Sequence, residues 1–240
     1  MSDQQSQQWQ DELMEYLVHD LKSPLATILS NFHLLEQYVR DTAGGELLQN
    51  GRRAALRMER MILNILDIGR LEVGQLELKT VKVPIEDLLE EAIRAVHLAG
   101  RYRGVEIECD LKQWADVVVR VDFDLMTRVI VNLLDNAIRF SPDDSPVIIT
   151  ATRNADAQLV VAIKDRGIGV PEQWQERIFD KYIKRGEQGP GRSSHGMGLT
   201  FAKLVSNVHG ITIGVRPGEP EGSEFYLIFP PHQHRQAGTY

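Results

Sequence analysis

The sequence has 240 residues, 42% of them hydrophobic and 25% charged, which is typical of a globular protein of one or two domains and excludes a fibrous or disordered chain. The formal net charge is −7, with 34 acidic against 27 basic residues, and this argues against nucleic-acid binding through phosphate neutralisation. Cys109 is the only cysteine, which excludes an internal disulfide and a cysteine-rich metal site.

The first predicted element is an amphipathic helix over residues 9–39, where apolar residues recur at spacings of three or four. RDTAGGE then interrupts the pattern, and the pair Gly44-Gly45 suits a tight turn between helices. A second apolar stripe predicts a helix over residues 46–71. Two such helices form an antiparallel hairpin, and a single hairpin leaves its apolar seam exposed to water. We therefore expect a homodimer in which two hairpins make a four-helix bundle.

The remainder of the chain alternates strand and helix patterns. Six short apolar or alternating runs predict strands: VEIECD, DVVVRVD, PVIITATR, QLVVAIKD, ITIGVRP and EFYLIFP. Helices are predicted between them, near residues 85–100, 123–140, 171–179 and 198–208. We therefore expect an α+β fold with four parts: a helical hairpin over residues 1–72, a hinge or linker over 73–84, an α/β sandwich over 85–232 and a frayed tail over 233–240.

No apolar run reaches the roughly 18 residues of a membrane span, and the N-terminus lacks the pattern of a signal peptide. These features predict a cytoplasmic chain that makes no membrane contact of its own.

His19 lies on the first predicted helix, in the stretch LVHDLKSP. It is about 200° around the helix from Leu21 and so points away from the apolar stripe. Pro24 lacks the N–H that would bond the carbonyl of Asp20, so the helix should loosen within a turn of the histidine. An exposed imidazole beside a carboxylate is suited to proton or group transfer, and the alternative is a solvated surface histidine.

Two motifs in the second half carry groups that suit a bound ligand. Asn132 and Asn136 lie four apart on one helical face, with Arg139 a turn further on, and amide oxygens can ligate Mg²⁺ while arginine holds phosphate. Asp165 leaves a strand into the turn DRGIG, whose glycines let a ligand approach the backbone. Polar surface and a common tight turn are the alternatives.

A glycine-rich loop follows and ends at a predicted helix N-terminus. Its backbone N–H groups would form a cradle for phosphate, contributed by Gly196, Met197, Gly198 and Leu199. A flexible loop without a ligand is the alternative.

The order of these motifs resembles the motif series of the sensor histidine protein kinases. The series consists of HDLKSP, N-x-x-x-N, D-x-G-x-G, RIFDKY and GMGL, and the resemblance covers the chain from about residue 13 to residue 230. The resemblance implies a dimerisation and histidine phosphotransfer hairpin, followed by an ATP-binding domain of the type shared with the gyrase, Hsp90 and MutL ATPases.

The resemblance also implies roles for single residues. His19 is then the phosphoacceptor, and Asp20 is the acid–base partner that orients its imidazole. Asn136, and less strongly Asn132, would be the Mg²⁺ ligands. Asp165 would bind the adenine amino group in a pocket shaped by Gly167 and Gly169. The other implied nucleotide contacts are Arg139, Phe140, the F-box residue Phe179 and the cradle Gly196, Met197, Gly198 and Leu199, with residues 184–195 as a lid over ATP.

Together these roles predict a protein histidine kinase that uses ATP and Mg²⁺ to phosphorylate His19. A hinge near residues 71–75 would bring the ATP-binding domain to the hairpin. The phosphoryl group would then pass to an aspartate of a response-regulator receiver domain. Ser23 stands where relatives that dephosphorylate this partner carry threonine or asparagine, so phosphatase activity stays an open alternative.

Two other classes of function are weighed against the kinase. One is a docking module that keeps the fold without turning over ATP, and the complete set of nucleotide motifs argues against it. The other is an ATPase or serine kinase in which His19 is incidental, and the HDLKSP context argues against that. Whether His19 is phosphorylated by its own chain or by the partner chain stays open. Because 18 residues precede His19, we expect the catalytic core of a longer sensor or a kinase governed by another subunit.

Overall fold

The chain was analysed as a computed structural model, which describes residues 21, 25–35, 38, 42–109, 114, 117–180, 197–231 and 234–236. The chain divides into two compact units, Met1–Leu76 and Glu77–Tyr240. His19, Asp20, Ser23, Gly196 and the lid residues 184–195 lie outside the described residues.

The first unit contains two helical segments that pack along an apolar seam. Residues 25–35 are helical, and helix α2 spans Thr42–Glu72. The seam consists of the buried Leu25, Ala55 and Ile62, with Leu29, Phe32 and Leu66 packed against them. The helical hairpin expected from the sequence is confirmed.

Helix α2 begins earlier than the apolar stripe predicted. Gly44 and Gly45, which we expected in the connecting turn, lie in the first turn of α2. Backbone N–H groups of a first turn have no partner within the helix, and a glycine inside a helix costs only about 1 kcal/mol relative to alanine. The glycine pair is therefore tolerated there, and the connection between the two helical segments precedes Thr42.

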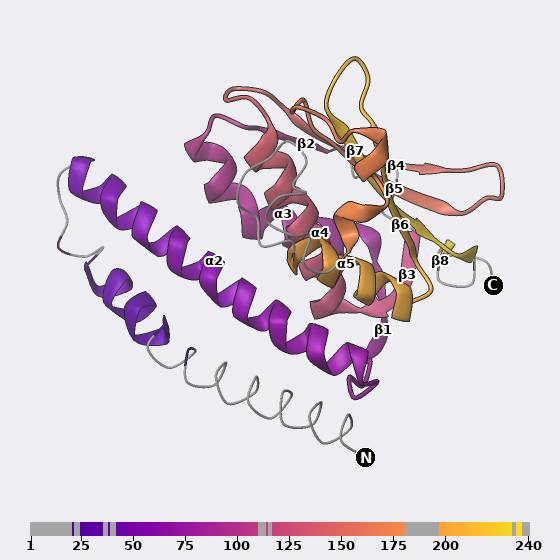
Figure 1. Cartoon of the computed structure of the whole chain (residues 1–240), viewed down its shortest axis with the longest axis horizontal. Coiled ribbons are helices and arrows are strands. Elements are labelled where there is room, and N and C mark those ends of the chain that lie inside the picture. Colours follow the sequence, from indigo (N-terminus) through magenta and orange to yellow (C-terminus); the bar gives the residue numbers. More distant parts are fainter. Residues whose placement is uncertain are drawn as a thin grey trace. The chain divides into compact units, whose positions relative to one another are not determined.

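The second unit has a five-stranded sheet with helices packed on it (Figure 1). The strands lie in the order β2-β4-β5-β7-β6, and only β2 and β4 pair in parallel. They span Ile107–Cys109 (β2), Val147–Arg153 (β4), Leu159–Lys164 (β5), Thr212–Pro217 (β6) and Ser223–Phe229 (β7). The helices are α3 (Ile85–Tyr102), α4 (Phe123–Phe140) and α5 (Met197–Val208). This arrangement confirms the expected α+β fold.

Helix α4 packs against both α3 and α5, and its apolar face is buried. Leu134, Met126 and Ile130 have no exposed surface, and each such side chain contributes about 1.5 to 3 kcal/mol through burial. Asp122 caps its start by accepting a hydrogen bond from the N–H of Leu125 (3.2 Å). The helix ends at Phe140, and its C-cap Ser141 is extended (φ −63°, ψ 145°) because a proline follows it.

A second, antiparallel sheet corrects two boundaries that we expected. It has the order β1-β3-β8, with strands Thr80–Pro84 (β1), Val117–Asp122 (β3) and His234–Gln236 (β8). Strand β1 lies at the end of the stretch predicted as a linker that enters a strand, and β8 lies in the tail predicted as frayed. Both pair with β3, whose backbone groups would otherwise lack partners on either side. Such pairing between distant segments leaves no signal in a local sequence pattern.

The helix predicted near residues 171–179 is replaced by two 3₁₀ turns, η2 (Glu172–Trp174) and η3 (Arg177–Phe179). Of the residues in these turns only Phe179 is buried, so there is no apolar stripe to stabilise a longer helix.

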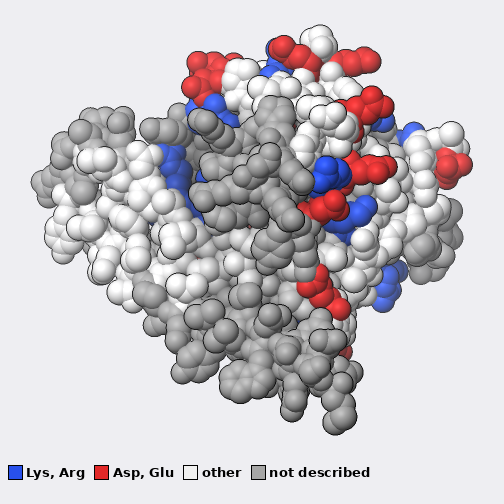
Figure 2. Space-filling view, in the orientation of Figure 1, with Lys and Arg blue, Asp and Glu red and all other residues white. Residues whose placement is uncertain are grey.

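In the part of the chain that the structure describes, every helix is too short or too polar to cross a membrane. On the face shown in Figure 2, acidic and basic side chains lie interspersed among the described residues.

Candidate functional site

Asp165 is the buried carboxylate at the centre of the candidate site. It follows β5 directly and is 5% exposed. Its Oδ1 accepts hydrogen bonds from the N–H of Gly167 (2.8 Å) and of Ser223 (3.2 Å). Burial raises the pKa of Asp165 above its ordinary value, and the two backbone hydrogen bonds partly oppose that rise. The carboxyl group of Asp165 is therefore buried, and hydrogen bonds from the turn after β5 and from the start of β7 fix its orientation.

Three glycines allow the backbone to close around this carboxylate. A Cβ added at Gly222 would lie 1.9 Å from the carbonyl oxygen of Asp165, and Gly222 has φ +90°. Gly169 also has a positive φ, +72°, which other residues rarely adopt. A Cβ at Gly167 would lie 2.6 Å from the carbonyl oxygen of Phe140. The turn after β5 therefore packs directly on the last residue of α4.

Asn132 and Asn136 lie one turn apart on α4, and both are half-buried. A Cβ added at Gly198 would lie 3.2 Å from Oδ1 of Asn132, so the missing side chain lets the first turn of α5 approach the amide. Arg128, one turn earlier on α4, lies over the ring of Phe201 at 4.4 Å from its centroid. The structure thus brings Asn132 and the predicted phosphate cradle together.

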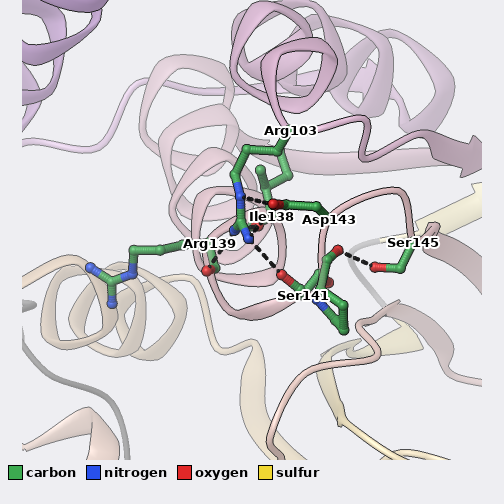
Figure 3. Close-up of polar contacts among 7 residues, drawn as sticks. Arg103, Ile138, Arg139, Ser141, Asp143 and Ser145 are labelled. Carbon is green, nitrogen blue, oxygen red and sulfur yellow. Dashed lines mark hydrogen bonds and ion pairs between the residues drawn. The ribbon is translucent and has the colours of Figure 1, made fainter.

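At the other end of α4, Arg139 and Phe140 follow Asn136. The guanidinium carbon of Arg139 lies 4.3 Å from the centroid of the Phe140 ring. Figure 3 shows the side chain of Arg139 extending away from the adjacent cluster around Arg103. Helix α4 therefore links the asparagines to the Asp165 turn.

Phe179 is buried in the segment that precedes the predicted lid. It meets Phe225 edge to face, with 6.4 Å between ring centroids. Nζ of Lys203 lies 5.8 Å from the centroid of the Phe179 ring. The hydroxyl of Thr200 donates to the carbonyl of Asp180 (3.2 Å), which ties the end of η3 to the first turns of α5. Of the predicted cradle, Met197, Gly198 and Leu199 are described, and they begin α5.

Some of these residues were not predicted. Gly222 and Ser223 complete the Asp165 turn, although they lie 57 and 58 positions further along the chain. The only available signal was a glycine directly before the strand SEFYLIF. His19, Asp20 and Ser23 belong to the first unit and lie outside the described residues, so no geometry relates them to the site.

No group of three or more acidic, histidine or cysteine side chains that could hold a metal ion occurs within the described ranges. The donor set on α4 consists instead of amide oxygens. Such ligands suit Mg²⁺, which keeps several waters and takes further oxygens from phosphate.

The described fold is that of a nucleotide-binding domain of the histidine kinase and gyrase class. Residues 121–233 match the family model "Histidine kinase-, DNA gyrase B-, and HSP90-like ATPase". Residues 9–74 match a second model, "His Kinase A (phospho-acceptor) domain". Together these two domains make the catalytic core of the sensor histidine kinases, and the chain belongs to this family.

The curated relatives are longer than this chain. The alginate biosynthesis sensor protein KinB of Pseudomonas aeruginosa is 29% identical over 217 residues, covering 88% of this chain and 35% of the relative. The adaptive-response sensory kinase SasA of Gloeothece citriformis is 29% identical over 231 residues, covering 92% of this chain and 58% of the relative. The chain thus spans about a third to three fifths of the length of these relatives.

Solved structures share the fold. Full-length ShkA in complex with AMPPNP superposes with a TM-score of 0.68 at 22% identity, covering 95% of this chain and 47% of that one. The histidine kinase AdeS of Acinetobacter baumannii has a TM-score of 0.56 at 19% identity, covering 88% of this chain and 96% of that one.

Proposed function

We propose that this chain binds ATP and Mg²⁺, phosphorylates its own His19 as a homodimer, and passes the phosphoryl group to an aspartate of a response-regulator receiver domain. The proposal that the chain binds ATP rests on the geometry of Asp165. Both of its hydrogen bonds from described residues use Oδ1. Oδ2 can therefore accept the exocyclic amino N–H of adenine, while the closely packed glycine turn holds the carboxylate in place.

The phosphates would lie along α4, toward the start of α5. Met197, Gly198 and Leu199 are the first described residues of α5. Backbone N–H groups at a helix N-terminus attract anions such as phosphate. Asn136 and Asn132 would hold Mg²⁺ through their amide oxygens, together with the phosphates. The bound ion would neutralise charge on the transferring group. Arg139 adds a permanent positive charge on the same helix.

In the transfer step, an imidazole nitrogen of His19 attacks the γ-phosphorus of ATP. The bond from this phosphorus to the β–γ bridging oxygen breaks, and ADP leaves. Asp20 accepts a hydrogen bond from the other ring N–H and holds the required tautomer. In the second step, a carboxylate oxygen of the receiver aspartate takes the phosphoryl group from the histidine. A water positioned by Ser23 would support dephosphorylation of the receiver.

The end of α2 fits the hinge that such a reaction needs. Gly74 has φ +67°, and the N–H of Gln75 donates to the carbonyl of Arg70 (2.9 Å). A left-handed residue with this hydrogen bond is a common way to end a helix. Beyond it the chain leaves the helix, so residues 71–75 separate a phosphotransfer domain from an ATP-binding domain.

A homodimer is supported by apolar side chains that the hairpin of a single chain leaves exposed. Leu47 is 73% exposed and Met58 is 52% exposed. Others in the same unit are Leu21, Ile28, Leu34 and Leu35. A large exposed apolar surface indicates a protein interface, and a second hairpin would cover it.

The proposal is tested by incubating the chain with γ-³²P-ATP and Mg²⁺. Acid-labile label is expected on the wild type and none on His19→Gln or Asp165→Asn. Label that persists on His19→Gln would show that another residue accepts the phosphate. A wild type that binds ATP but takes no label, with or without a receiver domain, would support the docking module instead.

A further inference from the structure

Arg103 binds the end of the central helix from outside the site. It is the residue at which α3 ends, and its side chain crosses to the C-terminus of α4 (Figure 3). Nη1 donates to the carbonyls of Ile138 (2.6 Å) and Arg139 (2.7 Å), and Nη2 donates to the carbonyl of Ser141 (2.9 Å). Nε donates to Oδ1 of Asp143 (2.8 Å). One side chain thus satisfies three carbonyls that the helix leaves without a partner.

The backbone of Arg103 is held as firmly as its side chain. Its carbonyl accepts a hydrogen bond from the N–H of Asp144 (3.1 Å). The next residue, Gly104, has φ +64°, and a Cβ there would lie 1.9 Å from Oδ1 of Asp144. In the same loop the hydroxyl of Ser145 donates to the carbonyl of Pro142 (2.6 Å; Figure 3). The end of α3 and the loop after α4 are therefore joined by several hydrogen bonds, and we call residues 103–104 and 141–145 the corner.

This corner adjoins the candidate nucleotide site at the carbonyl of Phe140. Between residues 138 and 141, Arg103 bonds every carbonyl except that of Phe140. The Phe140 carbonyl packs instead on Gly167, where an added Cβ would lie 2.6 Å away. The N–H of Gly167 in turn donates to Oδ1 of Asp165. A shift of the last turn of α4 would therefore move the Gly167 turn and reorient the buried carboxylate.

We propose that Arg103 is a positioning residue of the nucleotide site, which sets the place of the Asp165 turn by fixing the last turn of α4. The inference deepens the proposed function, because it requires Asp165 to read the adenine. Arginine suits the role since its planar fork has five N–H donors, whereas a lysine ammonium is a single point with three. Its positive charge also suits the negative end of a helix.

The test compares Arg103→Gln and Arg103→Lys with a matched control. In the control Arg153→Gln, the arginine removed also donates to a backbone carbonyl, that of Ala157 (2.9 Å), at the turn between β4 and β5. Three quantities are measured on the whole chain: the ¹H–¹⁵N resonance of the Gly167 amide without nucleotide, the KM for ATP with the labelling rate at saturating ATP, and the melting temperature.

We expect a shifted Gly167 resonance in both Arg103 variants. The KM for ATP should rise about tenfold in Arg103→Gln and by less in Arg103→Lys. The rate at saturating ATP should stay within about twofold of wild type, because the reacting groups are untouched. Arg153→Gln should change neither the resonance nor the KM.

An unchanged Gly167 resonance and KM in a folded Arg103→Gln protein would overturn the proposal, even if its melting temperature fell. If Arg103→Gln does not fold, Arg103→Lys decides by the same two readouts. The resonance needs no nucleotide, so it tests the positioning role even in a chain that fails to bind ATP. Such a failure would contradict the proposed function alone.

Discussion

The backbone N–H of Asp122 donates to Nε2 of His209 over 3.0 Å, which joins the start of α4 to the end of α5. Because Nε2 accepts, the ring proton is on Nδ1, which donates to the carbonyl of Val205 (2.8 Å). Asp122 also caps α4 and accepts from the N–H of Lys79 (2.9 Å). One buried histidine thus holds together the two helices whose facing residues are Asn132 and Gly198.

Replacing His209 with alanine should lower the free energy of unfolding by about 2 to 3 kcal/mol, because the N–H of Asp122 loses its acceptor and a cavity opens. Urea denaturation followed by circular dichroism measures the change. His97→Ala, at an exposed position of α3, is the matched control and should stay within about 0.5 kcal/mol of wild type. Equal losses in the two variants would contradict this role of His209.

Asp165→Asn should abolish ATP binding. Its amide oxygen would accept from the N–H groups of Gly167 and Ser223, and its NH₂ group would then replace Oδ2, which leaves no acceptor for the adenine amino group. Its effect on stability should depend on pH. The pKa of Asp165 is raised in the folded chain, so wild type loses stability as the pH rises from the unfolded pKa of about 3.8 through the folded pKa. The variant has no such loss.

The advantage of Asp165→Asn over wild type should therefore grow through that pH window and then remain constant. Urea midpoints at a series of pH values measure it, and isothermal titration at neutral pH measures ATP binding. A stability difference that shrinks as the pH rises would show that the pKa of Asp165 is lowered instead.

Gly222→Ala should destabilise the second unit by about 2 kcal/mol or more, since alanine is strained at φ +90° and its Cβ meets the carbonyl of Asp165. Gly45→Ala is the contrasting control. Gly45 lies in α2 with no atom within 4 Å of an added Cβ, so alanine should stabilise the helix by about 0.5 to 1 kcal/mol. Differential scanning calorimetry should show these opposite signs, and a harmless Gly222→Ala would contradict the close approach.

Leu47→Asp should dissociate the proposed homodimer without unfolding the hairpin, because this side chain is exposed in the single chain. Analytical ultracentrifugation should show a monomer, while circular dichroism should show unchanged helix content. Leu98→Asp, at an exposed apolar position on α3, should leave the dimer intact. A dimer that survives Leu47→Asp would place the interface elsewhere.

The spacing of apolar residues predicted those helices and strands that bury one face and expose the other. The stripe from Leu125 to Ile138 predicted α4 with its observed bounds, and alternating apolar runs predicted the strands of the larger sheet. Residues whose partners are distant in the chain escaped prediction. Arg103 and Ser223 look like ordinary surface residues in the sequence, because the carbonyls and carboxylate that they bond lie 35 to 58 positions away. Strand β8 was missed for the same reason.

The site residues were found by another route. Asn132, Asp165 and the glycines were recognised because their types and order carry chemistry, and the structure brings Asn132 to Gly198 and Asp165 to Gly167. Their roles toward ATP remain predictions.

The close packing of Phe32 against Gly51 limits how the two helical segments of the hairpin can move. A Cβ at Gly51 would lie 2.4 Å from the tip of the Phe32 ring, so the ring sits in a notch that only glycine provides. On the same face of α2 the next residues are Leu48 and Ala55, both buried, so sliding along the seam would drive the ring toward their side chains. The Phe32 ring therefore opposes sliding of one helical segment past the other, whereas a movement of both segments together keeps this contact.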